Sequence, residues 1–120
     1  MKIALTSMGE GLDAQVDPRF GRAKVFLVID TETEAIEVVD NTQNLEASQG
    51  AGIQAAQIVA ETGAEVVITG HCGPNAFRTL TAAGIKLVVG AEGKIGEVVA
   101  KFKSGELKPA EGADVEGHWI

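Results

Sequence analysis

The densest group of chemically active side chains in this 120-residue sequence is the pair His71-Cys72, followed directly by Gly73 and Pro74. A predicted strand ends here and a predicted helix begins, and a helix start favours the thiolate form of a cysteine. A thiolate beside an imidazole suits copper, iron–sulfur species and other soft metals. Two adjacent ligands do not complete a zinc site, and adjacent residues seldom aim at each other as a catalytic Cys–His pair must. His71 and Cys72 are therefore candidate metal ligands, and the alternative for Cys72 is a small buried apolar residue.

Two arginines, Arg19 and Arg22, lie three positions apart in a polar, glycine-bearing stretch after the first predicted strand. Guanidinium groups in such a loop can hold an anion through paired hydrogen bonds. The alternative is that the arginines pair with Asp13 and Asp17 and order the loop. Phe20, between the two arginines, is expected to anchor the loop in the core.

Glycine-rich turns precede two predicted helices, one at Gly50 and Gly52 and the other at Gly73 and Asn75. The first turn of a helix presents unpaired N–H groups and the positive end of the helix dipole, which favour a bound anion. The pattern matches neither the P-loop nor the dinucleotide-binding fingerprint, and Ser48 is a candidate N-cap. We expect the four residues at these turns, together with the two arginines, to contact a bound cofactor.

Apolar periodicity predicts five strands and three helices that would position these residues. The strands are expected at 2–6, 24–30, 35–41, 65–69 and 85–89. The helices are expected at 50–62, from Gly73 to Gly84, and at 95–102. The second and third strands are joined by a short polar segment and form a hairpin.

This order predicts a three-layer α/β fold with a five-stranded mixed sheet and helices on both faces. Right-handed crossovers place strand 65–69 beside strand 2–6 and strand 85–89 outside it, all parallel, while the hairpin pairs on the other side of strand 2–6. Ligands in such sheets bind at the carboxyl ends of the parallel strands. Three loops would meet there, at 7–22, 41–52 and 70–75.

The composition excludes several classes of function. With 17 Asp and Glu against 10 Lys and Arg, the net charge of −7 argues against nucleic-acid binding, and the chain has no tyrosine and one tryptophan for base stacking. The single cysteine excludes a disulfide framework and favours a reducing compartment. No signal peptide and no stretch of 18 apolar residues is present, so we expect a cytoplasmic protein without a membrane span.

The chain length predicts one domain. We place it at residues 1–104, because apolar periodicity stops there, and we expect an acidic, flexible tail at 105–120. The alternative for Trp119, near the end of this tail, is that it packs back on the domain.

Several segments, in this order and spacing, resemble the dinitrogenase iron–molybdenum cofactor biosynthesis family, of the NifX and NifB C-terminal domain type and orange-protein-like. These segments are Phe20-Gly21-Arg22, residues 50–57 (GAGIQAAQ), residues 66–70 (VVITG), residues 73–77 (GPNAF) and residues 83–86 (AGIK). The resemblance covers about residues 1–104. Nitrogenase-associated members often have histidine where this chain has Arg19, so the contact of Arg19 with a cluster is expected to be electrostatic.

The resemblance implies a ribonuclease H-like fold without nuclease activity and a role in carrying or storing an anionic metal–sulfur cluster. The orange proteins of sulfate reducers hold a molybdenum–copper sulfide cluster without covalent attachment. For this chain the resemblance implies an iron–molybdenum cofactor precursor or another cluster of iron, molybdenum or copper with sulfide. The expected partners are proteins of metallocluster assembly or proteins that accept the cluster.

Three functions remain open from the residues. The leading hypothesis is a non-enzymatic binding protein for a metal–sulfur cluster, because helix starts, arginines and a thiol converge on one edge of the predicted sheet. The second is a non-catalytic interaction or regulatory module that docks a partner, and the third is a small enzyme that uses Cys72.

Overall fold

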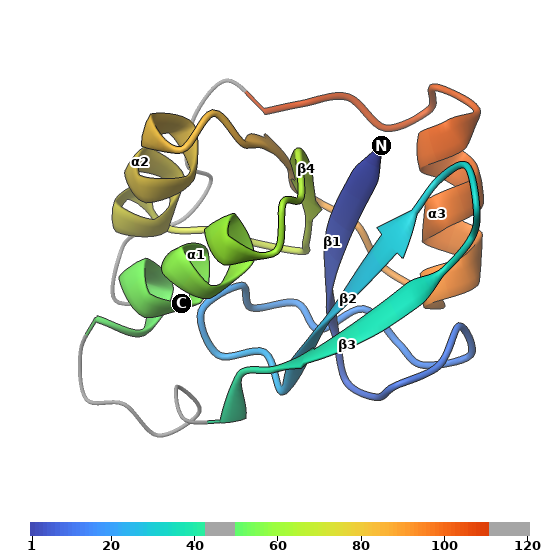
Figure 1. The fold of residues 1–120 in the computed structure, drawn as a ribbon, viewed down its shortest axis with the longest axis horizontal. Helices are drawn as coiled ribbons and strands as arrows, with labels where there is room; N and C mark the ends of the chain where they lie inside the picture. The colour runs from blue at the N-terminus through green and yellow to red at the C-terminus, as the bar shows by residue number, and fades with distance from the viewer. Residues whose placement is uncertain (43–49, 111–120) are drawn as a thin grey trace.

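A five-stranded mixed sheet forms the centre of the structure, a computed structural model that describes residues 1–42 and 50–110 (Figure 1). The elements are β1 (Lys2–Ser7), β2 (Val25–Asp30), β3 (Ile36–Asp40), α1 (Ala51–Glu61), β4 (Val66–Ile68), α2 (Pro74–Ala82), β5 (Lys86–Val88) and α3 (Ile95–Lys103). The strand order is β3-β2-β1-β4-β5, with β1, β4 and β5 parallel and β2 antiparallel to both of its neighbours. The predicted mixed sheet and its strand order are therefore confirmed.

Alternating side chains of the central strands supply two separate cores, one on each face of the sheet. Ala4 of β1 lies in a cluster with α1 and α2, whereas its neighbours Ile3 and Leu5 lie in a cluster with α3. All three are fully buried. Because successive strand residues point to opposite faces, this alternation requires helices on both sides, as the sequence predicts.

Glycines end the first two helices where the sequence predicts a stop. Gly63 and Gly84 have φ angles of 82° and 78°, a left-handed conformation that glycine adopts without a Cβ clash. Pro74 occupies the first turn of α2, where a missing N–H leaves no helical hydrogen bond unmade. The observed strands β3, β4 and β5 are each two residues shorter than predicted, one residue at either end.

The segment that follows α3 returns to the outer strand β5. Leu107 is half-buried and packs against the core on the α3 side. The N–H of Ala110 donates to the carbonyl oxygen of Leu87 in β5 at 2.6 Å. Residues 105–110 therefore contact the domain, while residues 111–120, including Trp119, lie outside the described residues. The division into domain and tail stays a prediction. None of the helices in the described part of the chain has the length and hydropathy needed to cross a bilayer.

Candidate anion site

The loop after β1 returns to the end of β4 and pairs with it through the main chain. The N–H of His71 donates to the carbonyl oxygen of Pro18 at 2.8 Å, and the N–H of Phe20 donates to the carbonyl oxygen of His71 at 3.2 Å. Arg19 and His71 thereby form a short parallel bridge. These hydrogen bonds place an arginine from one loop next to the histidine of another, as expected for loops at the carboxyl ends of parallel strands.

Two glycines allow the loops to approach more closely than any other residue would. A Cβ built on Gly70 would lie 2.7 Å from Cα of Pro18, and a Cβ built on Gly21 would lie 2.9 Å from Cα of Gly52. Both distances are shorter than real Cβ contacts, so a side chain at either position requires the backbone to move. The segment 18–21 is therefore held between the β4–α2 turn on one side and the start of α1 on the other.

A buried aromatic residue and a buried polar network hold this segment from below. Phe20 is fully buried, with its ring centroid 5.5 Å from that of Phe26 in β2, which confirms the predicted core anchor. The hydroxyl oxygen of Thr6 lies 2.7 Å from the carbonyl oxygen of Asp17 and 2.8 Å from the hydroxyl oxygen of Thr69. The ends of β1 and β4 are thus tied both to each other and to the returning loop.

Asp17 orders the loop around its own carboxylate. Its Oδ1 accepts the backbone N–H of Arg19 at 3.0 Å, which is the turn that an Asp before proline favours. Burial raises the pKa of Asp17, while the backbone N–H groups of Arg19 and Lys24 and the charge of Arg19 oppose that rise. Asp17 therefore contacts Arg19 through the main chain, and the Arg19 side chain is exposed at the surface.

Two helices start beside these residues without acidic side chains in their first turns. The N-cap residues are Gly50 for α1 and Gly73 for α2, and neither start has a side-chain cap. By contrast, the first turn of α3, on the other face of the sheet, carries Glu97. The first N–H groups of α1 and α2 therefore carry the positive end of each helix dipole with no carboxylate of the same turn beside them. We call residues 18–22, 50–52 and 70–75 together the loop junction.

The candidate side chains differ in how they lie at the loop junction. Arg19 and Asn75 are exposed, and Arg22 and His71 are half-buried. Asn75 accepts a hydrogen bond from the Arg78 guanidinium through its side-chain oxygen. The sequence-predicted residues of the three loops are thus brought to one end of the sheet, except that residues 43–49, with Ser48, lie outside the described residues.

Cys72 lies inward from the other candidates. It is fully buried in the core on the α1 and α2 side, and its Sγ lies 3.6 Å from the carbonyl oxygen of Gly73. This position agrees with the alternative considered for Cys72, a small side chain beneath the loop. Within residues 1–42 and 50–110, no three His, Cys, Asp or Glu side chains come together in a way that could hold a metal ion.

Sequence reasoning missed the residues that assemble the loop junction, namely Pro18, Gly21 and Gly70. Their role depends on contacts between segments far apart in the chain, which no local pattern reports. The local signals were the dipeptide Asp17-Pro18, which favours a turn, and the presence of Gly21 and Gly70 in segments that resemble the family.

The fold and the loop junction define a small α/β protein that presents two arginines and two helix N-termini at the carboxyl end of its parallel strands. The family model described as "Dinitrogenase iron-molybdenum cofactor" matches residues 1–105. The chain therefore belongs to this family, as its sequence segments predict.

Two solved structures and one sequence relative are similar to this chain. The apo form of the orange protein from Desulfovibrio gigas is 47% identical, with a TM-score of 0.93, and the alignment covers 95% of this chain and 96% of that one. A putative NifB protein from Thermotoga is 35% identical, with a TM-score of 0.83 and coverage of 97% and 98%. An uncharacterised protein from Methanocaldococcus jannaschii is 26% identical over 115 residues, which span 92% of this chain and 97% of that protein.

Proposed function

We propose that this protein binds an anionic metal–sulfur cluster at the loop junction and carries or stores it for metallocluster assembly. The observation that carries the proposal is the main-chain pairing of Arg19 with His71 beside two helix N-termini that have no acidic residue in their first turns. Elsewhere the protein is acidic, with a net charge of −7, so an anion is repelled by most of its surface. Membership of the iron–molybdenum cofactor family supports a cluster of this kind as the cargo.

Each group at the loop junction has a distinct role in this proposal. The guanidinium groups of Arg19 and Arg22 supply positive charge and hydrogen bonds to terminal sulfide or oxide. The N–H groups at Gly50, Gly52, Gly73 and Asn75 provide further donors at the two helix starts.

The two candidate metal ligands differ in access. His71 is half-buried and can present an imidazole nitrogen to a metal such as copper. Cys72 is fully buried, so its sulfur reaches a cluster only if the β4–α2 turn moves. We therefore propose that charge and main-chain donors contribute more to retention than the thiol does.

Reconstitution of the purified protein with thiomolybdate and copper or iron tests the proposal, because a retained metal–sulfide chromophore is read by visible absorption after gel filtration. Arg19→Glu should lower retention about tenfold or more, since it replaces an attractive charge by a repulsive one. The matched control is Lys101→Glu, which makes the same change of charge on α3, on the opposite face of the sheet. Cys72→Ala should only weaken retention.

Three results would count against the proposal. Equal retention by Arg19→Glu and the wild type excludes the loop junction as the site. Equal losses of cluster retention in Arg19→Glu and Lys101→Glu mean that net charge alone, and not the position of Arg19, controls retention. A larger loss in Cys72→Ala than in Arg19→Glu means that thiolate coordination dominates.

The remaining features of the proposal follow from this role. The partners are proteins that assemble or accept the cluster, the protein acts in the cytoplasm, and it performs no catalysis. The family model and the similarity to the putative NifB protein support a role next to cofactor assembly. The ribonuclease H-like character of the fold likewise remains a prediction.

A further inference from the structure

We propose that the outer edge of β3 is a docking strand for an extended segment of a partner protein in which aliphatic and basic residues alternate. β3 ends the sheet, with β2 as its one neighbour in the described part of the chain. This proposal concerns a different surface from the loop junction and does not depend on cluster binding.

The hydrogen-bond register shows which main-chain groups β3 offers. The N–H of Asp30 donates to the carbonyl oxygen of Ala35, and the N–H of Asn41 donates to the carbonyl oxygen of Lys24. These two pairs flank β3, so in this register the odd-numbered residues between them form the hydrogen bonds to β2. Hydrogen bonding alternates along an antiparallel strand. Ile36, Val38 and Asp40 therefore direct their N–H and carbonyl groups away from the sheet, in the geometry that an added strand needs.

The same residues leave apolar side chains uncovered. Ile36 and Val38 are 41% and 42% exposed. Their side chains lie on the α3 face, because their register partners Ile29 and Leu27 belong to the core on that side. Beta-branched side chains on an unpaired edge are a liability for aggregation, so a protein that keeps them exposed needs a cover or a charge that prevents pairing with itself.

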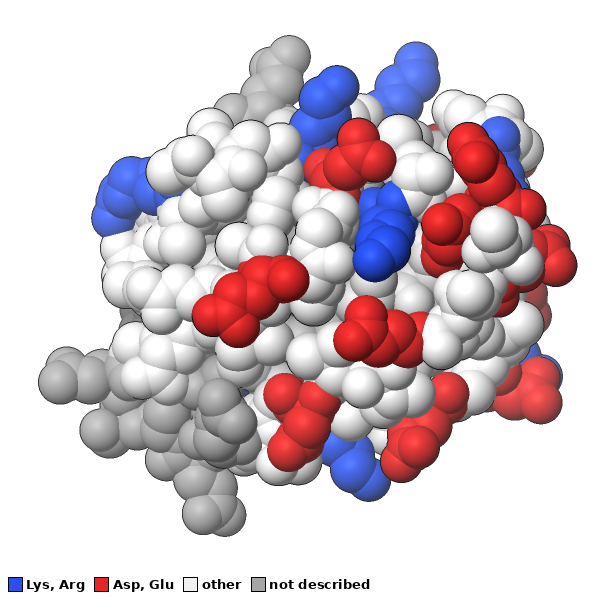
Figure 2. Space-filling model, viewed as in Figure 1, with Lys and Arg blue, Asp and Glu red and all other residues white. Residues whose placement is uncertain are grey.

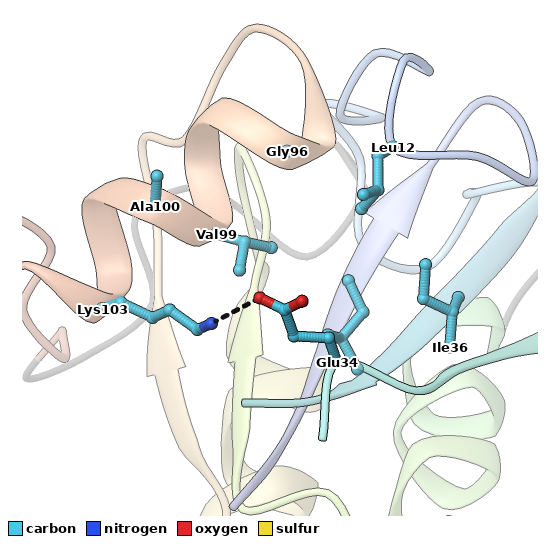
Figure 3. A pocket seen from close by; sticks show the side chains of 8 residues that line it. Leu12, Glu34, Ile36, Gly96, Val99, Ala100 and Lys103 are labelled. Atoms are coloured by element: carbon cyan, nitrogen blue, oxygen red, sulfur yellow. Dashed lines mark ion pairs between the residues drawn. The ribbon is translucent and has the colours of Figure 1, made fainter. Parts of the chain in front are cut away.

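A groove next to these side chains extends the apolar surface. It has a volume of about 290 Å³ and lies between α3 and the β2–β3 hairpin (Figure 3). Its apolar lining comes from Leu12, Ile29, Ile36, Val99 and Ala100. An ion pair of 3.5 Å between Glu34 Oε1 and Lys103 Nζ joins the hairpin to α3 beside it. An aliphatic side chain of a strand added to β3 would pack beside Ile36 and enlarge the apolar surface next to the groove.

Charge determines which partner fits. The hairpin carries five carboxylates between residues 30 and 40, and the sequence has no Lys or Arg from residue 25 to residue 77. Figure 2 shows acidic side chains gathered on the side of the molecule that holds the hairpin and α3, whereas the surface over α1 and α2 has few. Two copies of β3 paired edge to edge would bring two such hairpins together, and like charges across strands are destabilising. The occupant is therefore a basic segment of another protein rather than a second copy.

The alternation of the partner follows from the two faces of β3. On the α3 face its side chains would meet Ile36 and Val38, which favours aliphatic residues. On the other face Glu37 is exposed, which favours lysine or arginine. This combination supplies main-chain hydrogen bonds for affinity and alternate side chains for specificity.

The test uses a blocked peptide of alternating lysine and valine, long enough to span β3, and follows amide hydrogen exchange of the full chain. We expect the peptide to slow exchange of the Ile36 and Val38 amides about tenfold or more at saturation. A matched peptide with the same sequence, N-methylated at alternate residues on its pairing edge, keeps charge and apolar surface but cannot form the ladder. It should give no protection.

Two protein variants sharpen the test. Val38→Lys places a positive charge on the docking edge and should weaken peptide binding about tenfold. Gln57→Lys adds the same charge at an exposed position of α1 and should leave binding nearly unchanged. Equal binding of the two peptides, or equal effects of the two substitutions, would reduce the interaction to general electrostatics and overturn the proposal. Self-association of the protein through β3, with no protection by the peptide, would overturn it in favour of a second copy.

Discussion

The contact between Gly70 and Pro18 provides the most direct test of how the loop junction is built. Gly70→Ala would place a Cβ 2.7 Å from Cα, 2.8 Å from the carbonyl oxygen and 3.1 Å from the carbonyl carbon of Pro18. Contacts between nonbonded carbon atoms are favourable at about 3.5–4.0 Å, so the overlap with Pro18 Cα approaches 1 Å. All three atoms belong to the main chain, and the proline ring restricts the backbone further, so no side chain can rotate away.

The expected cost follows from this overlap. Overpacking of a well-packed site costs roughly 1–3 kcal/mol, and a clash with main-chain atoms belongs near the upper end, at about 2–3 kcal/mol. For a chain of this length that corresponds to a fall in the melting temperature of about 8–12 °C. Displacement of the backbone by the new Cβ also separates the N–H of His71 from the carbonyl oxygen of Pro18, which lie 2.8 Å apart in the wild type. Hydrogen exchange of the His71 amide should therefore accelerate.

Urea unfolding and amide exchange of Gly70→Ala measure both effects, with Gly11→Ala as the matched control. A Cβ on Gly11 meets no atom within 4 Å, and its φ lies outside the left-handed region, so this substitution should change the free energy of unfolding by less than about 0.5 kcal/mol. The contrary outcome is that the two variants have free energies of unfolding within about 0.5 kcal/mol of each other, with wild-type exchange of the His71 amide in Gly70→Ala. In that case the close approach of the loops does not depend on this glycine.

Three further predictions concern other residues. Phe20→Ala removes a fully buried ring and should lower the free energy of unfolding by roughly 3–5 kcal/mol in urea, and a loss below about 1 kcal/mol would contradict its role as anchor. Glu34→Gly should raise the free energy of unfolding by about 0.5–1 kcal/mol, because Glu34 has a φ of 64° that glycine adopts without strain and the ion pair lost is exposed. The control Lys103→Ala removes the same ion pair and should change this free energy by less than about 0.5 kcal/mol. Hydrogen bonds from Thr42 lower the pKa of Asp40, so the contribution of Asp40 to stability is present at neutral pH and is lost as pH falls below the ordinary value of 3.8. Burial raises the pKa of Asp17, so the ionised carboxylate opposes folding and this cost disappears as pH falls. Carboxyl titration by NMR should show pKa shifts of opposite sign for the two residues. The effects of Asp40→Asn and Asp17→Asn on the free energy of unfolding should change in opposite directions between pH 7 and pH 3, and a change in the same direction would contradict these assignments.

The helices and strands and their order along the chain can be predicted from the sequence alone. Helix α3 follows from apolar residues at 95, 98, 99 and 102, and the ends of α1 and α2 follow from Gly63 and Gly84. The strand order follows from right-handed crossovers and a short hairpin. These features depend on periodicity and on local backbone preference, which are properties of neighbouring residues. The family resemblance also rests on local segments, and it was confirmed.

Which candidate side chains lie together depends on contacts between distant segments of the folded chain. His71 and Cys72 are adjacent in a turn without regular periodicity, so the sequence does not tell that His71 stays half-exposed while Cys72 enters the core. The packing of Leu107 and the hydrogen bond from Ala110 to Leu87 were likewise hidden, because both join segments that are far apart in the chain. The burial of Asp17 depends on such long-range contacts too. Local sequence patterns carry no information about which distant backbone covers a loop, and this cover decides which side chains a ligand can reach.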